Sequence, residues 1–208
     1  MKKEITDIKQ NKSNKNHSVF INNEFAFSLP EIDILYYKMA IGNEITDERI
    51  AYIQKHVIEA KAVAVASKYL SFKPRTKKEV IKKLQEKEFT QNVIEKTVDL
   101  MEEYNYINDV EYIHNYIDAK KTLGKRRIKQ ELIMRGVDRD AIEKVFLSHF
   151  TDGEEITDTI AALFDKKLRG NKNPDQKERE RAFNFVGRRG FSFSEAKEGY
   201  ARYLELDD

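Results

Sequence analysis

Residues 124–146 read GKRRIKQELIMRGVDRDAIEKVF, and their apolar pattern decides the fold class. Ile128 and Leu132 stand four residues apart, the spacing that places two side chains on one face of a helix. Gly136 then occupies a position where a left-handed residue commonly ends a helix. In residues 137–142 two apolar residues flank an aspartate, the pattern of an N-cap within a hydrophobic staple. The stretch therefore predicts two short helices joined by a tight turn.

The same pattern occurs in two other parts of the chain. One copy lies 48 residues earlier, at 80–94, and another lies 54 residues later, at 182–196. A further apolar-periodic segment precedes each copy, so the predicted unit has three helices. One such unit is small, and stacking on its neighbours would help to bury its apolar faces. We therefore expect a mainly α-helical protein with three tandem three-helix (helix-turn-helix-like) repeats in an elongated array.

Residues at the expected helix ends support this interpretation. Thr76 and Glu79 have the spacing of a capping box at the start of a middle helix. In the third repeat Asn173 and Pro174 are expected to open the middle helix as its N-cap and first residue. Gly190, like Gly136, suits a left-handed C-cap.

The first 58 residues differ from the repeats. Residues 18–21 and 24–28 are short apolar-rich runs on either side of Asn22 and Asn23. Because Asn tolerates positive φ, the pair suits a two-residue hairpin turn. We expect a small β-hairpin and helix cap, which also includes a strand at 5–8, a helix at 30–40 and a helix start at Thr46. The expected boundaries are a cap at 1–58 and repeats at 59–107, 108–152 and 153–208.

The near-neutral total charge hides an alternation along the chain. The 208 residues include 38 Lys and Arg and 36 Asp and Glu, a net charge of +2. Segments 61–90 and 166–189 each have nine basic and three acidic residues, and segment 120–137 has seven and one, so each carries +6. Basic blocks in phase with a repeat suit a polyanion or an acidic protein groove, and they predict phosphate contact without base readout. The candidate contact residues are Lys77, Lys78, Lys82, Lys83, Lys125, Arg126, Arg127, Lys129, Arg135, Arg179, Arg181, Arg188 and Arg189.

Other classes of function have little support in the sequence. The chain has no cysteine, which excludes disulfides and thiolate sites. It has neither a long apolar run nor a secretory signal, so we expect a soluble cytoplasmic protein. The four histidines lack ligand spacing and no Gly-rich phosphate loop is present, so we expect no catalytic residue and no metal site. One alternative stays open, an enzyme that binds Mg²⁺ through the acidic residues between Asp99 and Glu111.

Four segments resemble parts of the RecX family, whose members regulate the RecA recombinase. The stretch at 124–146 closely resembles the central segment of the family, and YIND at 106–109 resembles the passage before it. SKYLSFKPRTKKEVIKKLQEKEF at 67–89 resembles the first-repeat pattern. VFINNEFAFSLPEI at 19–32 resembles the N-terminal hairpin of RecX proteins from low-GC Gram-positive bacteria. Glu88 and Asn105 depart from the family pattern, which has glycine there, and this concerns local turn geometry.

The resemblance implies a function that the residues alone do not show. RecX proteins consist of tandem three-helix repeats, bind RecA, lie in the groove of its filament on single-stranded DNA and mostly inhibit it. This role places them in DNA repair, the SOS response and homologous recombination. They are not known as enzymes and need no cofactor, and we expect a monomer. A repeat array has the length to bridge several filament subunits, which adds avidity. The basic blocks leave a second hypothesis open, an independent nucleic-acid-binding protein that contacts phosphates.

Overall fold

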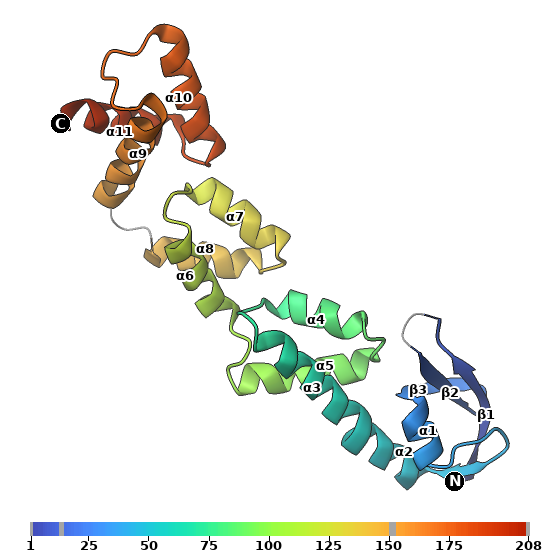
Figure 1. The fold of residues 1–208 in the computed structure, drawn as a ribbon. Coiled ribbons are helices and arrows are strands. Elements are labelled where there is room, and N and C mark those ends of the chain that lie inside the picture. Colours follow the sequence, from blue (N-terminus) through green and yellow to red (C-terminus); the bar gives the residue numbers. More distant parts are fainter. Residues whose placement is uncertain (1, 13–14, 150–152, 207–208) are drawn as a thin grey trace. The chain divides into compact units, whose positions relative to one another are not determined.

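The computed structural model describes residues 2–12, 15–149 and 153–206 (Figure 1). The chain forms two compact units, Met1–Asn108 and Asp109–Asp208. The repeat boundary predicted after residue 152 falls at the edge of a segment outside the described residues. Helices dominate both units, and a small sheet precedes them, as the sequence pattern predicts.

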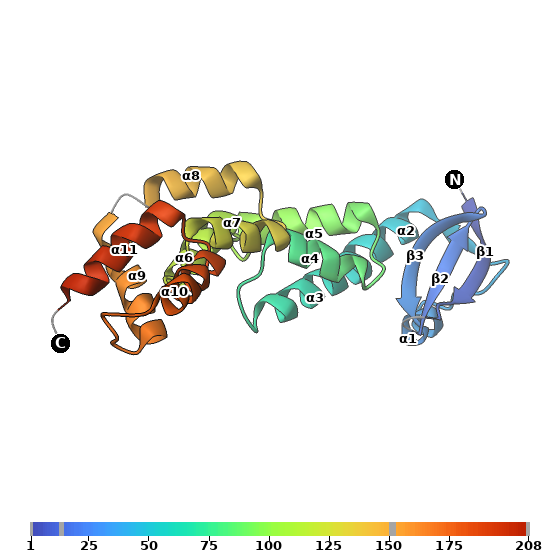
Figure 2. The same ribbon diagram turned by 90° about the horizontal axis from the view of Figure 1, so that it is seen from above.

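The first unit begins with a four-stranded antiparallel sheet in the order β3-β2-β1-β4. Figure 2 shows the first three of these strands side by side. Its strands are β1 (Lys2–Gln10), β2 (Asn16–Ile21), β3 (Glu24–Pro30) and β4 (Glu44–Thr46). Asn22 and Asn23 have φ angles of 50° and 67°, which confirms the predicted positive-φ hairpin turn. The strand expected at 5–8 is the longer β1. The sequence did not predict β4, because three residues are too few to show an alternating pattern.

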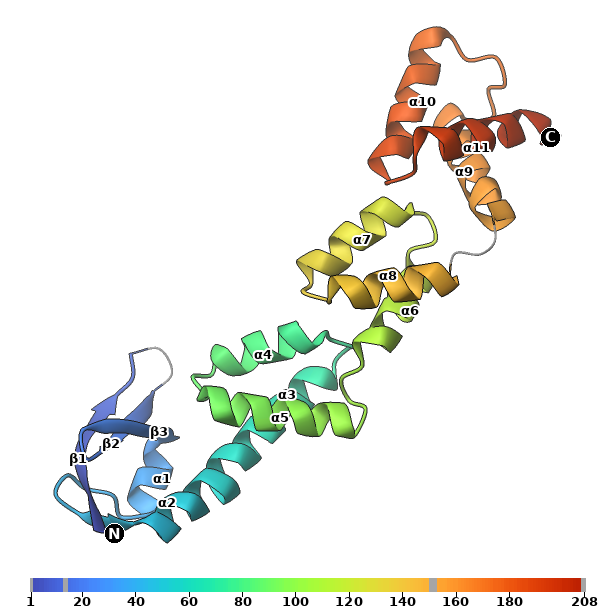
Figure 3. The ribbon, with the colours of Figure 1, turned by 180° about the vertical axis from the view of Figure 1, so that it is seen from behind.

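The helices of the first unit pack on the sheet to form one shared core. They are α1 (Glu31–Tyr36), α2 (Asp47–Ile53), the π-helix η1 (Gln54–Glu59), α3 (Ala60–Leu70), α4 (Lys77–Gln85) and α5 (Gln91–Glu103). Helices α2, η1 and α3 follow one another without a break (Figure 3). Thr76 and Glu79 form the predicted capping box at the start of α4. Phe27 and Leu29 of β3 are buried in the same cluster as Leu84 of α4.

Left-handed residues end several helices, as the repeat pattern predicts. Gly136 and Gly190 have φ angles of 83° and 95°. Glu88 and Asn105 have φ angles of 61° and 58°, so these two positions have the backbone that glycine favours. In the turn at Glu88 the amide of Phe89 donates to the carbonyl of Leu84, which satisfies a carbonyl at the end of α4. The turn geometry is therefore retained without glycine.

The second unit contains two three-helix sets, each with its own buried cluster. The helices are α6 (Asp109–Ala119), α7 (Lys125–Met134), α8 (Arg139–His149), α9 (Gly153–Leu168), α10 (Gln176–Arg188) and α11 (Phe193–Glu205). Ile128 and Leu132 of α7 are buried with residues of α6 and α8, and Phe164 of α9 is buried with residues of α10 and α11. The predicted start of α10 at Asn173-Pro174 is wrong. Asp175 is the N-cap, and it forms a capping box with Glu178.

No helix among the described residues has both the length and the apolar character that a membrane span requires.

Candidate nucleic-acid interface

Two glycines join the two helix sets of the second unit. The amide of Gly124, just before α7, donates to the carbonyl of Arg189, just after α10, with an N···O distance of 2.9 Å. A Cβ on Gly124 would lie 2.4 Å from the carbonyl carbon of Gly190. A Cβ on Gly190 would lie 2.4 Å from the Cβ of Arg127. Because only glycine permits such an approach, these residues hold the first turn of α7 against the end of α10.

This joint creates an open depression between α7 and α10, which we call the arginine groove. It has a volume of about 450 Å³. Its lining residues are Arg126, Arg127, Gln130, Asn184, Gly187, Arg188 and Gly190. The lining therefore combines three guanidinium groups with two side-chain amides and contains no carboxylate. Such a surface offers many hydrogen-bond donors to an anion.

Arg127 is held in place by two residues behind the groove. Its Nε donates to a carboxylate oxygen of Glu131 at 2.7 Å. The other Glu131 oxygen accepts the hydroxyl proton of Tyr116 from α6. The Tyr116 hydrogen bond, helped by Arg127, holds the pKa of Glu131 below its usual value, while burial raises the pKa of Tyr116. The carboxylate thus stays ionised and fixes the direction of the Arg127 side chain.

Arg126 and Arg188 present uncompensated charge to the groove. Both side chains belong to exposed residues, one on α7 and one at the end of α10. Neither has an ion-pair partner among the described residues. Like charges close together repel, so a bound anion would relieve a cost that the free protein carries. These two residues make the strongest anion-binding candidates in the second unit.

The structure uses other candidates of the second unit differently. Lys129 forms an ion pair with Glu143 of α8. The guanidinium of Arg135 lies 5.3 Å from the centre of the Tyr116 ring, and that of Arg189 lies 4.1 Å from the centre of the Phe185 ring. Lys125 lines a separate pocket between the two helix sets. Arg179 and Arg181 are exposed on α10 and do not line the groove.

The four candidates on α4, in the first unit, divide into two kinds. Lys77 pairs with Glu102 at 2.8 Å, and Lys83 pairs with Glu86 at 3.3 Å. Lys78 and Lys82 are exposed and have no ion pair among the described residues. They stand four positions apart and so share one face of α4. This face of α4 is a second surface that is chemically suited to contact phosphate.

Within the described residues, the acidic and histidine side chains do not assemble into a recognisable ligand set. The described part of the chain contains no group of three or more histidine and carboxylate residues placed to hold a metal ion. Glu102, in the acidic segment considered for Mg²⁺, is paired with Lys77. His114 and His149 do meet, contrary to their sequence spacing, with their Nδ1 atoms 3.4 Å apart.

Sequence reasoning missed the joint and the support behind the groove. Gly124 has a φ of −74°, so nothing in its own backbone requires glycine, and its role appears only when Gly190 is placed beside it. Tyr116 and Glu131 lie 15 positions apart on different helices. No local signal marks the joint, because Gly124 precedes α7 whereas Gly190 follows α10. The sequence pattern indicates only helix termination at Gly190.

Comparison with known protein families gives two matches within the helical part of the chain. The family description "RecX, first three-helix domain" matches residues 62–99. The description "RecX, second three-helix domain" matches residues 108–145. The first range covers most of α3, all of α4 and most of α5, and the second extends from the start of α6 into α8.

Curated relatives extend the similarity over most of the chain. "Regulatory protein RecX" of Leuconostoc mesenteroides is 30% identical over 209 residues, which cover 99% of this chain and 78% of the relative. The protein with the same name from Caldanaerobacter subterraneus is 33% identical over 162 residues, which cover 77% of this chain and 81% of the relative.

Two solved structures support the fold. A crystal structure described as regulatory protein RecX has a TM-score of 0.63 and 22% identity, and it covers 94% of this chain and 97% of that one. RecX from Lactobacillus salivarius has a TM-score of 0.64 and 20% identity, over 71% of this chain and 97% of that one. At these identities the likeness concerns the fold alone.

Proposed function

The chain belongs to the RecX family of regulatory proteins, and we propose that it is a non-enzymatic regulator that binds RecA and its filament on single-stranded DNA. In this proposal the protein is a cytoplasmic monomer without a cofactor, and its main effect is to inhibit the recombinase. The family membership supports the choice of RecA as partner. The single structural observation that carries the proposal is the arginine groove, a built concave surface with uncompensated positive charge.

The groove suits a filament that contains DNA. Phosphate oxygens accept hydrogen bonds from guanidinium groups in a fork geometry, and Arg127 is already oriented by Glu131. Arg126 and Arg188 add charge from two different helix sets. A contact of this kind positions the protein along a nucleic-acid backbone and carries no sequence preference. Lack of sequence preference fits a protein that must act on any stretch of filament.

The direct test is RecA-dependent ATP hydrolysis on single-stranded DNA, with the protein titrated in. We expect hydrolysis to fall with the unmodified chain and to fall much less with the double variant Arg126→Glu/Arg188→Glu. The matched control is Arg179→Glu/Arg181→Glu, which makes the same charge change on α10 outside the groove. If the unmodified chain alters neither filament assembly nor ATP hydrolysis nor strand exchange, the proposal is wrong.

A second candidate is an independent nucleic-acid-binding protein, and the arginine groove favours it as well. The two functions separate when DNA binding is measured without RecA. If about six phosphates are contacted on a single strand, log K should fall against log salt with a slope of roughly −4. Strong salt-dependent binding without any effect on RecA would support this candidate alone.

A further inference from the structure

Strand β3 has a free edge in the sheet of the first unit. The described strand order ends at β3, which pairs only with β2. Its other edge therefore presents backbone N–H and C=O groups that no strand of this sheet satisfies. Such an edge is a template for another extended chain unless something covers it.

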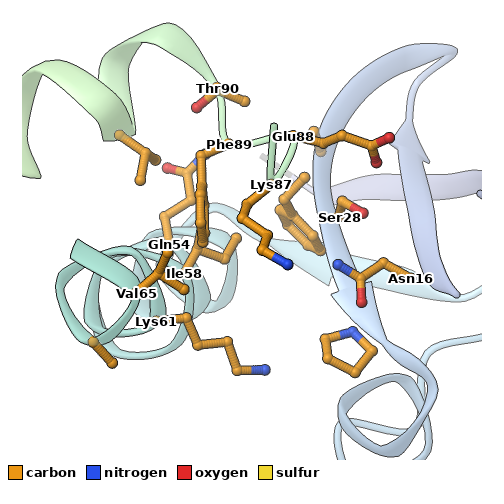
Figure 4. A pocket seen from close by; sticks show the side chains of 15 residues that line it. Asn16, Ser28, Gln54, Ile58, Lys61, Val65, Lys87, Glu88, Phe89 and Thr90 are labelled. Atoms are coloured by element: carbon orange, nitrogen blue, oxygen red, sulfur yellow. The ribbon is translucent and has the colours of Figure 1, made fainter. Parts of the chain in front are cut away.

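A cavity of about 360 Å³ runs along this edge (Figure 4). Its walls come from β3, from η1 and α3, and from the turn between α4 and α5. Ala26, Phe27 and Ser28 all line it. Because successive strand residues point to opposite faces, a cavity lined by all three lies against the strand's edge and not on one face.

A second depression adjoins the cavity and extends over the neighbouring part of the sheet, where Asn11 and Ser18 also line it. It has a volume of about 450 Å³ and is lined partly by Phe25, which is half exposed. The two share Ser28 and Glu88 as wall residues. Together they form a hollow beside β3, lined by residues of this strand between Phe25 and Pro30, and we call it the β3 hollow. Lining residues spread along the strand suit an extended guest.

The walls of the hollow combine apolar surface with three ammonium groups, those of Lys12, Lys61 and Lys87. Figure 4 shows Lys61 and Lys87 pointing into the cavity from α3 and from the turn after α4. Lys61 is paired with Asp33, whereas Lys87 has no ion-pair partner among the described residues. Glu88 contributes one carboxylate, which accepts a hydrogen bond from the side-chain amide of Asn11. The lysines that line the hollow outnumber this carboxylate, so the net charge of its walls is positive. The larger apolar side chains that line the cavity are Phe27, Ile58, Val65, Phe89 and Val93.

We propose that the β3 hollow binds an extended peptide that adds to the sheet beside β3 and presents an acidic side chain to Lys87. Main-chain hydrogen bonds to β3 supply the affinity in this mode, and the pockets for alternate side chains supply the specificity. Apolar side chains of the peptide, on either side of its acidic residue, pack against the apolar wall between Ile58 and Phe89. This site is separate from the arginine groove, and it holds or fails independently of any effect on RecA.

The test is fluorescence anisotropy with the full chain at low salt and the labelled peptide Thr-Val-Glu-Val-Thr-Val-Ser. We expect this peptide to bind, and the same peptide with Lys for Glu to bind at least tenfold more weakly. Lys87→Glu should weaken binding of the Glu peptide about tenfold. The matched control is Lys68→Glu. Lys68 is exposed near the end of α3 and does not line the hollow, so reversing its charge should have no effect.

Backbone addition is tested with two further peptides, each N-methylated on alternate residues. Only one of the two sets of N–H groups faces β3, so one methylated peptide should lose binding and the other should keep it. Slower hydrogen exchange at amides of Phe25–Ser28 should accompany binding.

The proposal is overturned if the peptide does not bind at millimolar concentration, if the Glu and Lys peptides bind equally, or if the two methylated peptides behave alike. Displacement by acetate alone would also overturn it, because the hollow would then hold a free anion. If Lys87→Glu fails to fold by circular dichroism, the methylated pair decides on the unmodified chain.

Discussion

A Cβ on Gly190 would lie 2.4 Å from the Cβ of Arg127 and 2.6 Å from its backbone nitrogen. The end of α10 therefore rests directly on the first turn of α7, with no room for a side chain. The arginine groove depends on this contact, because it brings Arg126 and Arg188 to one surface. Any change that forces the two helices apart should divide the groove without removing a charge.

The first prediction concerns Gly190→Ala. The residue has a φ of 95°, so alanine introduces left-handed strain of about 1 kcal/mol. Overlap with the Arg127 backbone adds about 1–3 kcal/mol, because backbone atoms cannot yield as a flexible side chain does. We expect a loss of about 2–4 kcal/mol in the free energy of unfolding, measured by urea titration of the full chain.

Gly170→Ala is the matched control for this prediction. Gly170 also has a positive φ, 78°, but a Cβ there would meet nothing within 4 Å. It should show the strain alone, about 1 kcal/mol. Equal losses for the two variants would mean that the contact between Gly190 and Arg127 contributes nothing to stability.

The second prediction concerns Glu131→Gln and pH. The hydrogen bond from Tyr116 holds the pKa of Glu131 below its usual value, so the ionised carboxylate stabilises the folded state above the ordinary glutamate pKa of about 4.3. This contribution is lost as pH falls through the folded-state pKa. We expect Glu131→Gln to cost about 1 kcal/mol at pH 7 and much less at pH 3. The check is urea unfolding of both chains at the two pH values.

Glu143→Gln is the control for the pH effect. Its carboxylate pairs with Lys129 on the surface and is half exposed. Exposed ion pairs of this kind typically contribute between about 0 and 1 kcal/mol, so we expect a smaller loss than at Glu131. A loss at Glu143→Gln as large as that at Glu131→Gln would show that burial of the Tyr116 contact is not what matters.

Local sequence patterns predicted the helices well because their determinants are close along the chain. The i, i+4 pair Ile128 and Leu132 is buried as expected, and Thr76 caps α4. The start of α10 was misplaced because Asn173 and Pro174 carry the usual signals, yet Asp175 forms the actual capping box with Glu178. The spacing of Asp175 and Glu178 is itself a local capping-box signal, so the sequence contained the correct start beside the competing one.

The candidate site was predicted only in part, because charge counts do not show which cations are already paired. The sequence offers no reason to rank Lys77 and Lys129 below Lys78 and Arg126 as contact candidates. In the structure, carboxylates on neighbouring helices pair with Lys77 and Lys129. Arg126 and Arg188 stand 62 positions apart, and only the contact between Gly124 and Gly190 brings them together. Such a relation depends on the tertiary fold and leaves no local signal.

The third prediction concerns the salt dependence of binding to single-stranded DNA. Each phosphate contact contributes about 0.7 to the slope of log K against log salt. If Arg126 and Arg188 each contact one phosphate, Arg126→Glu/Arg188→Glu should make the negative slope shallower by roughly 1.4. Fluorescence anisotropy between low and moderate salt measures this. An unchanged slope with weaker binding would indicate an altered fold and not a lost phosphate contact.

The last prediction compares two charge reversals in the second unit. Reversing Arg126, Arg127 and Lys129 together should weaken binding to DNA or filament. It should also lower stability, because new carboxylates at Arg127 and Lys129 would face Glu131 and Glu143. Reversing Arg126 and Arg188 should weaken binding as much and leave the urea midpoint nearly unchanged, since neither breaks an ion pair in the described structure. Binding and unfolding measured on the same preparations separate the two outcomes. If the folded Arg126→Glu/Arg188→Glu variant binds as the unmodified chain does, the groove is an ordinary solvated surface.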